Sequence, residues 1–469
     1  MENTIVRLEE LEIYNFKNVK YGHINFNNPR KSYNANLLGL YGQNGSGKTA
    51  LIDAISLLKL ALSGQSVPKK ISDYINVDAQ EAKMKYAFKI TDKDKNIYSV
   101  VYEFSLRQDI DESRDNVDNV NQTNEHFKTT IFDEVLSYTC LCEGGKWRKL
   151  PVIDTRETES FTPEAKLNMF INGDKEKITD IIVARKLSAA TSKGFIFSTE
   201  LLKIIRDNCQ DPHHRYILER LSYYGKYELF IINTSNTALI SMNALPLMFR
   251  LKEGDKMDLG AVALPLNQAS LISNDVYRVA GKVIDDMNIV LKTIVPDLTI
   301  SIKDLGTQIL RDGNEGIRVQ LMSHKNSKEI PLEYESEGIK KIISILHLLI
   351  VIYNRSSITV AIDELDSGVF EYLLGELLQI ISERGKGQLI FTSHNLRPLE
   401  TLDRGFIAFT STNPENRYVR IPNVKTNNNL RDVYYRSILL GEQSEELYDL
   451  TNNSEIAFAF REAGEVSGS

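Results

Sequence analysis

The chain has 469 residues, 42% of them hydrophobic and 25% charged, which is enough for a sizeable core divided between two or three domains. A net charge of −7 gives no overall basic surface for nucleic acid, although distant residues could still build a local basic groove, so DNA stays a possible partner. The longest apolar run, residues 342–353, contains His347 and is too short to span a bilayer. We therefore expect a cytoplasmic protein without membrane contact.

The three cysteines, Cys140, Cys142 and Cys209, are too few and too irregularly spaced for a disulfide framework. Cys209 stands near two histidines in the stretch CQDPHH, a pattern that could suggest zinc. Asp211 and Pro212 are typical of a helix N-cap and first turn, so we expect a helix to begin here in preference to a metal site.

Apolar residues alternate with polar ones over most of the first 150 residues, which predicts strands. Residues 49–64 have helical spacing instead, so a strand, a glycine-rich turn and a helix follow one another there. An Asn- and Asp-rich stretch at 107–126 is typical of a solvated loop. The expected strands are residues 6–16, 21–27, 34–42, 83–90, 98–106 and 134–142.

The pattern becomes mainly helical between about residue 160 and residue 295. Helices are expected at 199–208, 214–224 and 274–294, the last closed by Pro296. We interpret this region as an insertion.

Strands and helices alternate again from residue 298, which favours a mainly parallel sheet and an α/β fold. We divide the chain into an N-terminal lobe 1–150, a mainly helical insertion 151–297, a C-terminal lobe 298–425 and an extension 426–469. The expected strands are 298–303, 317–323, 356–364 and 387–395. One expected helix begins after residue 335, and a second spans residues 369–385.

The stretch GQNGSGKT matches the phosphate-binding pattern G-x-x-x-x-G-K-[ST] in full and lies between an expected strand and helix. Its glycines let backbone N–H groups turn toward nucleotide phosphates, Lys48 would reach the β- and γ-oxygens, and the Thr49 hydroxyl would bind Mg²⁺. The motif therefore predicts ATP and Mg²⁺ as ligands. The expected nucleotide-binding residues are Gly42, Gln43, Asn44, Gly45, Ser46, Gly47, Lys48 and Thr49.

Two carboxylates end the fully apolar strand in SSITVAIDE, at the sheet edge where the phosphate loop also begins. Asp363 is the expected Mg²⁺ ligand. Glu364 is then free to act as general base on the attacking water, an effect of roughly 10² to 10⁴ in rate.

The stretch FTSHN ends the next expected strand and carries His394. A lone histidine is more often structural than catalytic, but this position falls at the same sheet edge as Asp363, so we expect His394 to sense the γ-phosphate. Asp366 lies in the turn after Glu364, where a neighbouring subunit could touch the nucleotide.

The stretch ESEGIKK precedes the apolar run at 342–353 and provides a second helix start with Ser336 and Gly338. A helix start of this kind is itself an anion site, because it has free N–H groups and a positive dipole end. If two protomers pack head to tail, Ser336 and Gly338 of one protomer can close over the γ-phosphate that the other protomer holds.

These elements together resemble the ATP-binding cassette (ABC) ATPases, and among them the RecF, SMC and OLD-like group. The opening LEIYNFKNV looks like the first strand of that group, ending in Phe16 and Lys17, and ESEGIKK resembles its E-S-x-G-x-K-K signature. The resemblance implies an ABC-type ATPase head with antiparallel strands near the N-terminus, and a nucleotide contact from Lys17. It covers roughly residues 1–65 and 300–400.

Departures from other branches narrow the resemblance. The signature lacks the LSGGQ form of transporter ATPases, long coiled-coil arms of the SMC kind are absent, and no acidic D-x-D cluster follows His394 as a Toprim nuclease would need. The resemblance therefore implies an ATP-driven switch that controls a separate effector, such as the nuclease toxins of the anti-phage systems PARIS and Septu. In that case residues 151–297 would recognise a trigger or partner. The alternatives are a RecF-like clamp that closes on DNA in repair and, less well matched, a transporter ATPase.

Overall fold

The computed structural model describes most of the chain, and all elements named below lie within the described residues. These are residues 4–111, 127–142, 145–146, 150–233, 244–253, 256–265, 268–310, 313–421, 429–440, 445–449 and 451–466. Most of the loop expected at 107–126 lies outside this description.

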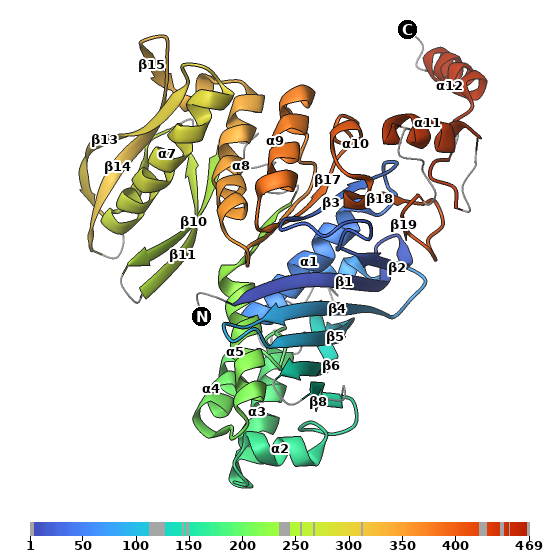
Figure 1. The fold of residues 1–469 in the computed structure, drawn as a ribbon, viewed down its shortest axis with the longest axis vertical. Helices are drawn as coiled ribbons and strands as arrows, with labels where there is room; N and C mark the ends of the chain where they lie inside the picture. The colour runs from blue at the N-terminus through green and yellow to red at the C-terminus, as the bar shows by residue number, and fades with distance from the viewer. Residues whose placement is uncertain are drawn as a thin grey trace, which may run out of the picture.

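The central sheet has the strand order β19-β18-β3-β17-β16-β9 and is parallel except for the β18–β19 pair (Figure 1). Its strands are β3 (Asn36–Tyr41), β9 (Leu229–Ile232), β16 (Thr359–Ile362), β17 (Gln388–Thr392), β18 (Ile407–Thr410) and β19 (Tyr418–Val419). Helix α1 (Lys48–Ser63) covers one face, and α8 (Glu337–Asn354) and α9 (Glu371–Arg384) cover the other. In β16, Ala361 therefore packs with the α1 core while Val360 and Ile362 pack with the opposite core.

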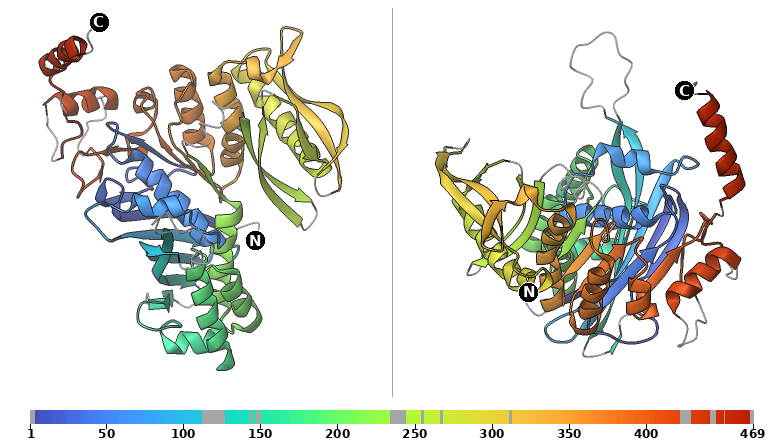
Figure 2. Two further views of the ribbon diagram at one scale, coloured as in Figure 1. Left: turned by 180° about the vertical axis from the view of Figure 1, so that it is seen from behind. Right: turned by 90° about the horizontal axis from the view of Figure 1, so that it is seen from above.

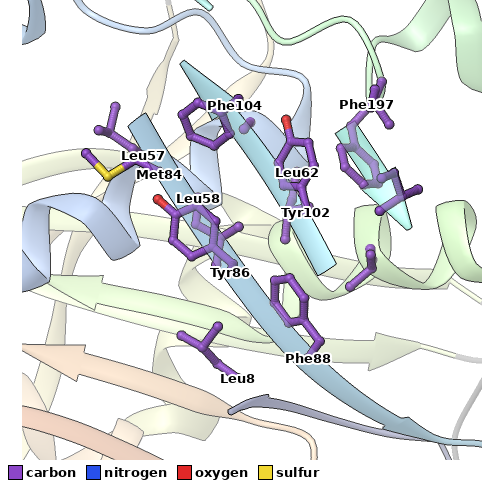
Figure 3. Packing of buried hydrophobic residues seen from close by; sticks show 14 of the residues in the cluster. Leu8, Leu57, Leu58, Leu62, Met84, Tyr86, Phe88, Tyr102, Phe104 and Phe197 are labelled. Atoms are coloured by element: carbon purple, nitrogen blue, oxygen red, sulfur yellow. The ribbon is translucent and has the colours of Figure 1, made fainter. Parts of the chain in front are cut away.

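An antiparallel sheet lies on the other side of α1, with strand order β2-β1-β4-β5-β6-β7 and β8 beside β6. Its strands are β1 (Ile5–Phe16), β2 (Val19–Asn25), β4 (Glu81–Thr91), β5 (Ile97–Ile110), β6 (Phe127–Cys142), β7 (Gly145–Lys146) and β8 (Leu150–Asp154). Alternate side chains of β4 and β5, among them Tyr86 and Phe104, pack against Leu58 of α1 (Figure 3). The Tyr86 hydroxyl is also satisfied, because it donates to the carbonyl of Ala54 at 2.7 Å.

The structure confirms a mixed α/β fold with a mainly parallel sheet and antiparallel strands near the N-terminus. Helices α2 (Glu164–Phe170), α3 (Glu176–Ala190), α4 (Thr199–Asn208) and α5 (Pro212–Tyr227) follow β8. The side chains of Ser198 and Asp211 cap α4 and α5, as the Asp-Pro pair predicts for α5. Within the described residues, no three His, Cys, Asp or Glu side chains are grouped as a metal site.

Residues 151–297, interpreted from the sequence as a mainly helical insertion, also contain the strands Leu229–Ile232, Ala244–Glu253, Lys256–Pro265 and Ser270–Ser273. Leu229–Ile232 forms β9, which pairs in parallel with β16 and so completes the central sheet. Gly225, one turn before β9, permits the close contact of α5 with α1, because a Cβ there would meet the Leu62 side chain at 2.4 Å. The segment therefore contributes a strand to the central sheet, which a four-residue apolar run after a long helix did not reveal.

A further lobe stands beside α8 (Figures 1 and 2). Its sheet has the order β12-β14-β13 with β15 beside β14, and a separate β10–β11 hairpin adjoins it. The elements are β10 (Ala244–Glu253), β11 (Lys256–Pro265), β12 (Ser270–Ser273), α7 (Asn274–Ile294), β13 (Thr299–Ile309), β14 (Glu315–Lys325) and β15 (Lys328–Pro331). The bounds of α7 agree with the predicted helix, whose start Ser273 caps.

Helix α10 (Pro398–Thr401) lies between β17 and β18, and α11 (Leu430–Leu440) and α12 (Asn453–Val466) follow β19. Helix α12 projects away from the body of the protein (Figure 2). Among the described helices, none combines the length and the apolar character needed to cross a membrane.

Candidate nucleotide site

The predicted phosphate loop lies between β3 and α1, at the carboxyl edge of the central sheet. Gly45 and Gly47 have φ of +77° and +95°, a region that favours glycine, and Gly47 is the N-cap of α1. Because the first N–H groups of a helix have no partner within it, the start of α1 provides donors for phosphate oxygens. The loop therefore has the backbone form that its sequence pattern predicts.

Lys48 is buried, and its ammonium donates to the carbonyl oxygens of Gly42 at 2.8 Å and Gln43 at 2.9 Å. Burial lowers the pKa of the Lys48 ammonium. The nearby carboxylates of Asp363, Glu364 and Asp366 oppose this shift of the pKa. A buried cation held over the phosphate loop and balanced by carboxylates is suited to binding the β- and γ-phosphates.

Asp363 follows β16 and is almost wholly buried. Its Oδ1 accepts a 2.6 Å hydrogen bond from the Thr392 hydroxyl, while its Oδ2 is enclosed without any hydrogen-bond partner. A buried carboxylate oxygen without a partner is costly unless a cation completes it. Since the Thr49 hydroxyl lines the same cleft, this oxygen pair fits Mg²⁺, which prefers hard oxygen ligands.

Glu364 lines the cleft beside Asp363 and has φ of +49°, which is unusual for a residue with a side chain. Its backbone N–H donates to the Thr392 hydroxyl at 2.8 Å. Thr392 therefore holds both carboxylate residues at once, because its hydroxyl accepts from one and donates to the other. The unusual backbone turns the Glu364 side chain to the cleft.

His394 is exposed and lines the cleft. Its loop is fixed by Asp366, whose Oδ2 accepts from the backbone N–H groups of His394 at 3.0 Å and Asn395 at 2.9 Å. The structure thus gives Asp366 a positioning contact within its own chain. Asp366 is not among the residues that line the cleft of this protomer.

Lys17 also lines the cleft, at a point where β1 has ended. Its ammonium forms an ion pair with Asp53 of α1 and lies 4.1 Å from the centre of the Tyr74 ring. The next residue, Asn18, donates from its side chain to the carbonyl of Gly45. The turn between β1 and β2 therefore contacts the phosphate loop.

Together these residues surround a cleft of about 430 Å³, which is large enough for a nucleotide. Its lining includes Lys17, Asn18, Asn44, Gly45, Gly47, Lys48, Thr49, Asp363, Glu364 and His394. Residues from both ends of the chain thus meet at one place, as the sequence predicts.

Sequence reasoning missed the supports of this cleft. The Thr410 hydroxyl contacts the Ser46 hydroxyl, the Tyr418 hydroxyl donates to the Gly47 carbonyl at 3.0 Å, and Thr392 orients the carboxylates. Each lies far along the chain from its partner. The FTSHN stretch contained a signal for Thr392, since it is the last residue of the strand beside Asp363.

Ser336 and Gly338 do not line this cleft. Ser336 is the exposed N-cap of α8, where its hydroxyl accepts from the Ile339 N–H at 3.3 Å. Gly338 packs against the turn after Glu364, because a Cβ at this position would meet the Gly368 carbonyl at 2.3 Å. The start of α8 thus packs against the turn that follows Asp363 and Glu364.

The other charges of ESEGIKK have partners within the chain. Lys340 forms a 2.7 Å ion pair with Glu337, and Glu335 accepts a 2.6 Å hydrogen bond from the Ser323 hydroxyl. Burial lowers the pKa of Lys341. Nearby carboxylates oppose this shift, and the effect of Glu364 is the largest among them. These charges therefore stabilise the helix start and the carboxylate edge.

A family model described as an AAA domain matches residues 10–238. No curated protein matches the chain. The matched span contains the phosphate loop, α1 and β9, whereas Asp363, Glu364 and His394 lie beyond it.

Among solved structures, the SMC head domain from Thermotoga maritima is similar at 14% identity and a TM-score of 0.36, covering 88% of this chain and 99% of that one. An SMC head bound to the C-winged helix domain of ScpA has 15% identity and a TM-score of 0.37, covering 88% and 98%. The recombination mediator RecF with ATP has 16% identity and a TM-score of 0.33, covering 83% and 94%. Likenesses at this level transfer no residue role. Over residues 10–238 the chain is similar to AAA domains, and its phosphate loop lies inside that span.

Proposed function

We propose that the chain is an ABC-type ATPase head that binds ATP with Mg²⁺ in the cleft and hydrolyses it to ADP and phosphate. The observation that carries this proposal is the enclosed, unpartnered Oδ2 of Asp363 in the same cleft as Lys48 and Thr49. Phosphoryl transfer requires a phosphate loop, a cation and an oxygen ligand for Mg²⁺ in one cleft, and the carboxylate oxygen of Asp363 can be that ligand.

Each residue has a distinct part in the proposed reaction. Lys48 and the α1 N-terminus bind the phosphates and stabilise charge that develops on the γ-phosphoryl oxygens. Thr49 and Asp363 would hold Mg²⁺, which supplies further charge neutralisation at the phosphates. Glu364 takes a proton from the attacking water, and His394 contacts the γ-phosphate, with Asp366 positioning its loop.

We further propose that two protomers close head to tail over the nucleotide. Ser336 is exposed at a helix start and lies outside the cleft of its own protomer, so its anion site is free to face a second copy. Gly338 supports this role, since its contact with Gly368 couples the helix start to the turn that follows Glu364.

The finer proposal is a switch that controls a separate effector, in particular a nuclease toxin in anti-phage defence. It rests on the family resemblance of the sequence motifs, and co-purification of a nuclease in the presence of ATP would support it. The alternative, a RecF-like DNA clamp, predicts instead that DNA stimulates ATP turnover and that rising salt removes this effect steeply.

The test of the shared site is ATP turnover by mixed assemblies of Lys48→Ala and Ser336→Arg subunits, purified through two different tags. Each variant alone should be inactive. A mixed head-to-tail pair contains one site with an intact phosphate loop and an intact signature, so about half the activity should return if the sites act independently. No recovery in mixed assemblies of confirmed mass would contradict closure between protomers.

A further inference from the structure

A second hollow lies at the opposite edge of the central sheet, and we call it the basic pocket. It is lined by Arg7 of β1, Lys89 of β4 and the loop between β2 and β3, which contributes Arg30 and Lys31. Glu9 is the carboxylate residue among its lining side chains, and the volume is about 490 Å³. Four cationic side chains thus share a pocket with one carboxylate.

Arg7 is the most enclosed of these cations. Its Nη2 donates to the backbone carbonyls of Asn34 and Lys386, and its Nη1 is buried without an acceptor. Burial lowers the pKa of the guanidinium from 12.5 to about 10, and the group remains a cation at neutral pH. No carboxylate of the described residues forms an ion pair with Arg7, so this charge is solvated by dipoles alone.

The strand register adds a like charge directly beside Arg7. Arg7 is the antiparallel partner of Lys89, and like charges opposite each other on one sheet face are destabilising. The neighbouring lysines of β4 are treated differently, because Lys85 pairs with Glu12 at 2.7 Å and Lys83 with Glu103 at 3.0 Å. The ion pairs of the β4 lysines with carboxylates therefore end where the basic pocket begins.

The two cations of the loop between β2 and β3 have only distant carboxylate contacts. Lys31 lies 3.9 Å from Asp403, whose other contacts include the side chain of Asn28. Arg30 shares this carboxylate, since its charge, after the hydrogen bonds from Asn28 and the Gly405 N–H, helps to lower the pKa of Asp403. The pocket therefore keeps an excess of positive charge after its nearest acid is included.

The basic pocket is separate from the nucleotide cleft. The carbonyls that Arg7 contacts belong to Asn34 and Lys386, just before β3 and β17, whereas the cleft lies after the ends of those strands. Six residues of β3 separate the two edges by roughly 20 Å. A ligand in the basic pocket would contact the amino ends of the strands that carry the phosphate loop and Thr392.

We propose that the basic pocket binds the phosphate group of a small phosphorylated molecule. A phosphate group carries a charge of about −2, so it offsets the charge of Arg7 and Lys89 together. The pocket volume is in the range of sites for small organic ligands, and Tyr33 provides an aromatic wall for the remainder of such a molecule.

The test is binding of inorganic phosphate and of AMP to the full chain, measured by calorimetry and by thermal shift at matched ionic strength. The starting protein carries Lys48→Ala, which weakens phosphate binding at the nucleotide cleft. We expect saturable binding of both probes, and we expect Arg7→Met in this background to weaken it by roughly tenfold to a hundredfold.

Two further variants control the test. Lys85→Met removes a lysine from the same sheet face that already has a carboxylate partner, and it should leave phosphate binding within about twofold. Lys89→Met removes an exposed cation of the pocket and should weaken binding even if the Arg7 variant fails to fold.

Three results would overturn the proposal. They are the absence of saturable phosphate binding, binding that neither the Arg7 nor the Lys89 substitution changes, and Arg7-dependent binding of a single-stranded thymidine oligonucleotide without binding of phosphate or AMP. The last result would assign the pocket to a nucleic-acid strand instead.

Discussion

A cation is enclosed at each edge of the central sheet, Lys48 being buried and Arg7 half-buried, but their surroundings differ. At the carboxyl edge, Asp363 and Glu364 face Lys48 and oppose the effect of burial on its pKa. At the amino edge, Arg7 is enclosed beside another cation and has only backbone carbonyls as acceptors. The difference suggests that the first edge is arranged for a cation and a nucleotide together, and the second for an anion alone. The predictions below begin with changes at the carboxyl edge.

Replacement of Lys48 by methionine should have the largest effect. We expect ATP turnover to fall at least about a hundredfold, because the cation over the transferred phosphate is lost. Lys59→Met is the matched control, since Lys59 is on the same helix and donates to the Leu229 carbonyl at 2.8 Å, away from the cleft. Lys59→Met should lower the midpoint of thermal unfolding and leave turnover per folded molecule near that of the unmodified chain.

Thr392→Val should reduce turnover by roughly tenfold to a hundredfold, since the hydroxyl orients Asp363 and Glu364 as an outer partner of the proposed Mg²⁺ site. Thr359→Val is the control at the opposite end of the neighbouring strand, where the hydroxyl donates to Gln388 at 3.0 Å. Equal loss of turnover in both variants would mean that Thr392 acts only through stability.

His214, a buried histidine away from both edges of the central sheet, should make the stability of the fold depend on pH. Burial lowers the pKa of His214 from 6.5 to about 4, and Asp211 only partly opposes this shift. Its ring is held neutral between the Tyr138 hydroxyl at 2.7 Å and Lys166 at 2.9 Å. Because the unfolded chain binds the proton first, stability falls as the pH drops from about 6.5 toward 4, by roughly 2 kcal/mol between about pH 7.5 and pH 5.

Urea unfolding at a series of pH values measures this effect. In the His214→Gln variant, the free energy of unfolding should fall less steeply as the pH drops below about 6.5. An unchanged slope in that variant would assign the acid sensitivity to other groups.

Two glycine substitutions should give stability changes of opposite sign. Gly338→Ala should destabilise the chain by about 1 to 2 kcal/mol, because the new methyl group meets the Gly368 carbonyl. Gly281→Ala, in α7 where nothing lies within 4 Å, should instead stabilise it by about 0.5 to 1 kcal/mol. Thermal unfolding of both variants provides the comparison, and stabilisation by Gly338→Ala would disprove the packing of α8 against the turn.

The candidate site was largely predictable from the sequence where its residues form continuous motifs. The phosphate loop and the Asp363–Glu364 pair could be placed because each directly follows an apolar strand. Thr410 and Tyr418 could not be placed, since their contacts with the loop depend on how β18 and β19 join the sheet. Leu229–Ile232 was assigned to an insertion because four apolar residues after a helix carry no period of their own. The Glu337–Lys340 pair follows from helical spacing, whereas the nearness of Lys341 to Glu364 depends on packing that the charge pattern does not encode.

The most direct test of the proposed function is ATP binding and ATP turnover by Glu364→Gln beside the unmodified chain. The account predicts that this variant binds ATP with similar affinity and hydrolyses it roughly 10² to 10⁴ times more slowly, since the amide cannot accept the proton of water. Turnover near that of the unmodified chain would contradict the assignment of Glu364 as general base and the proposed reaction at this cleft.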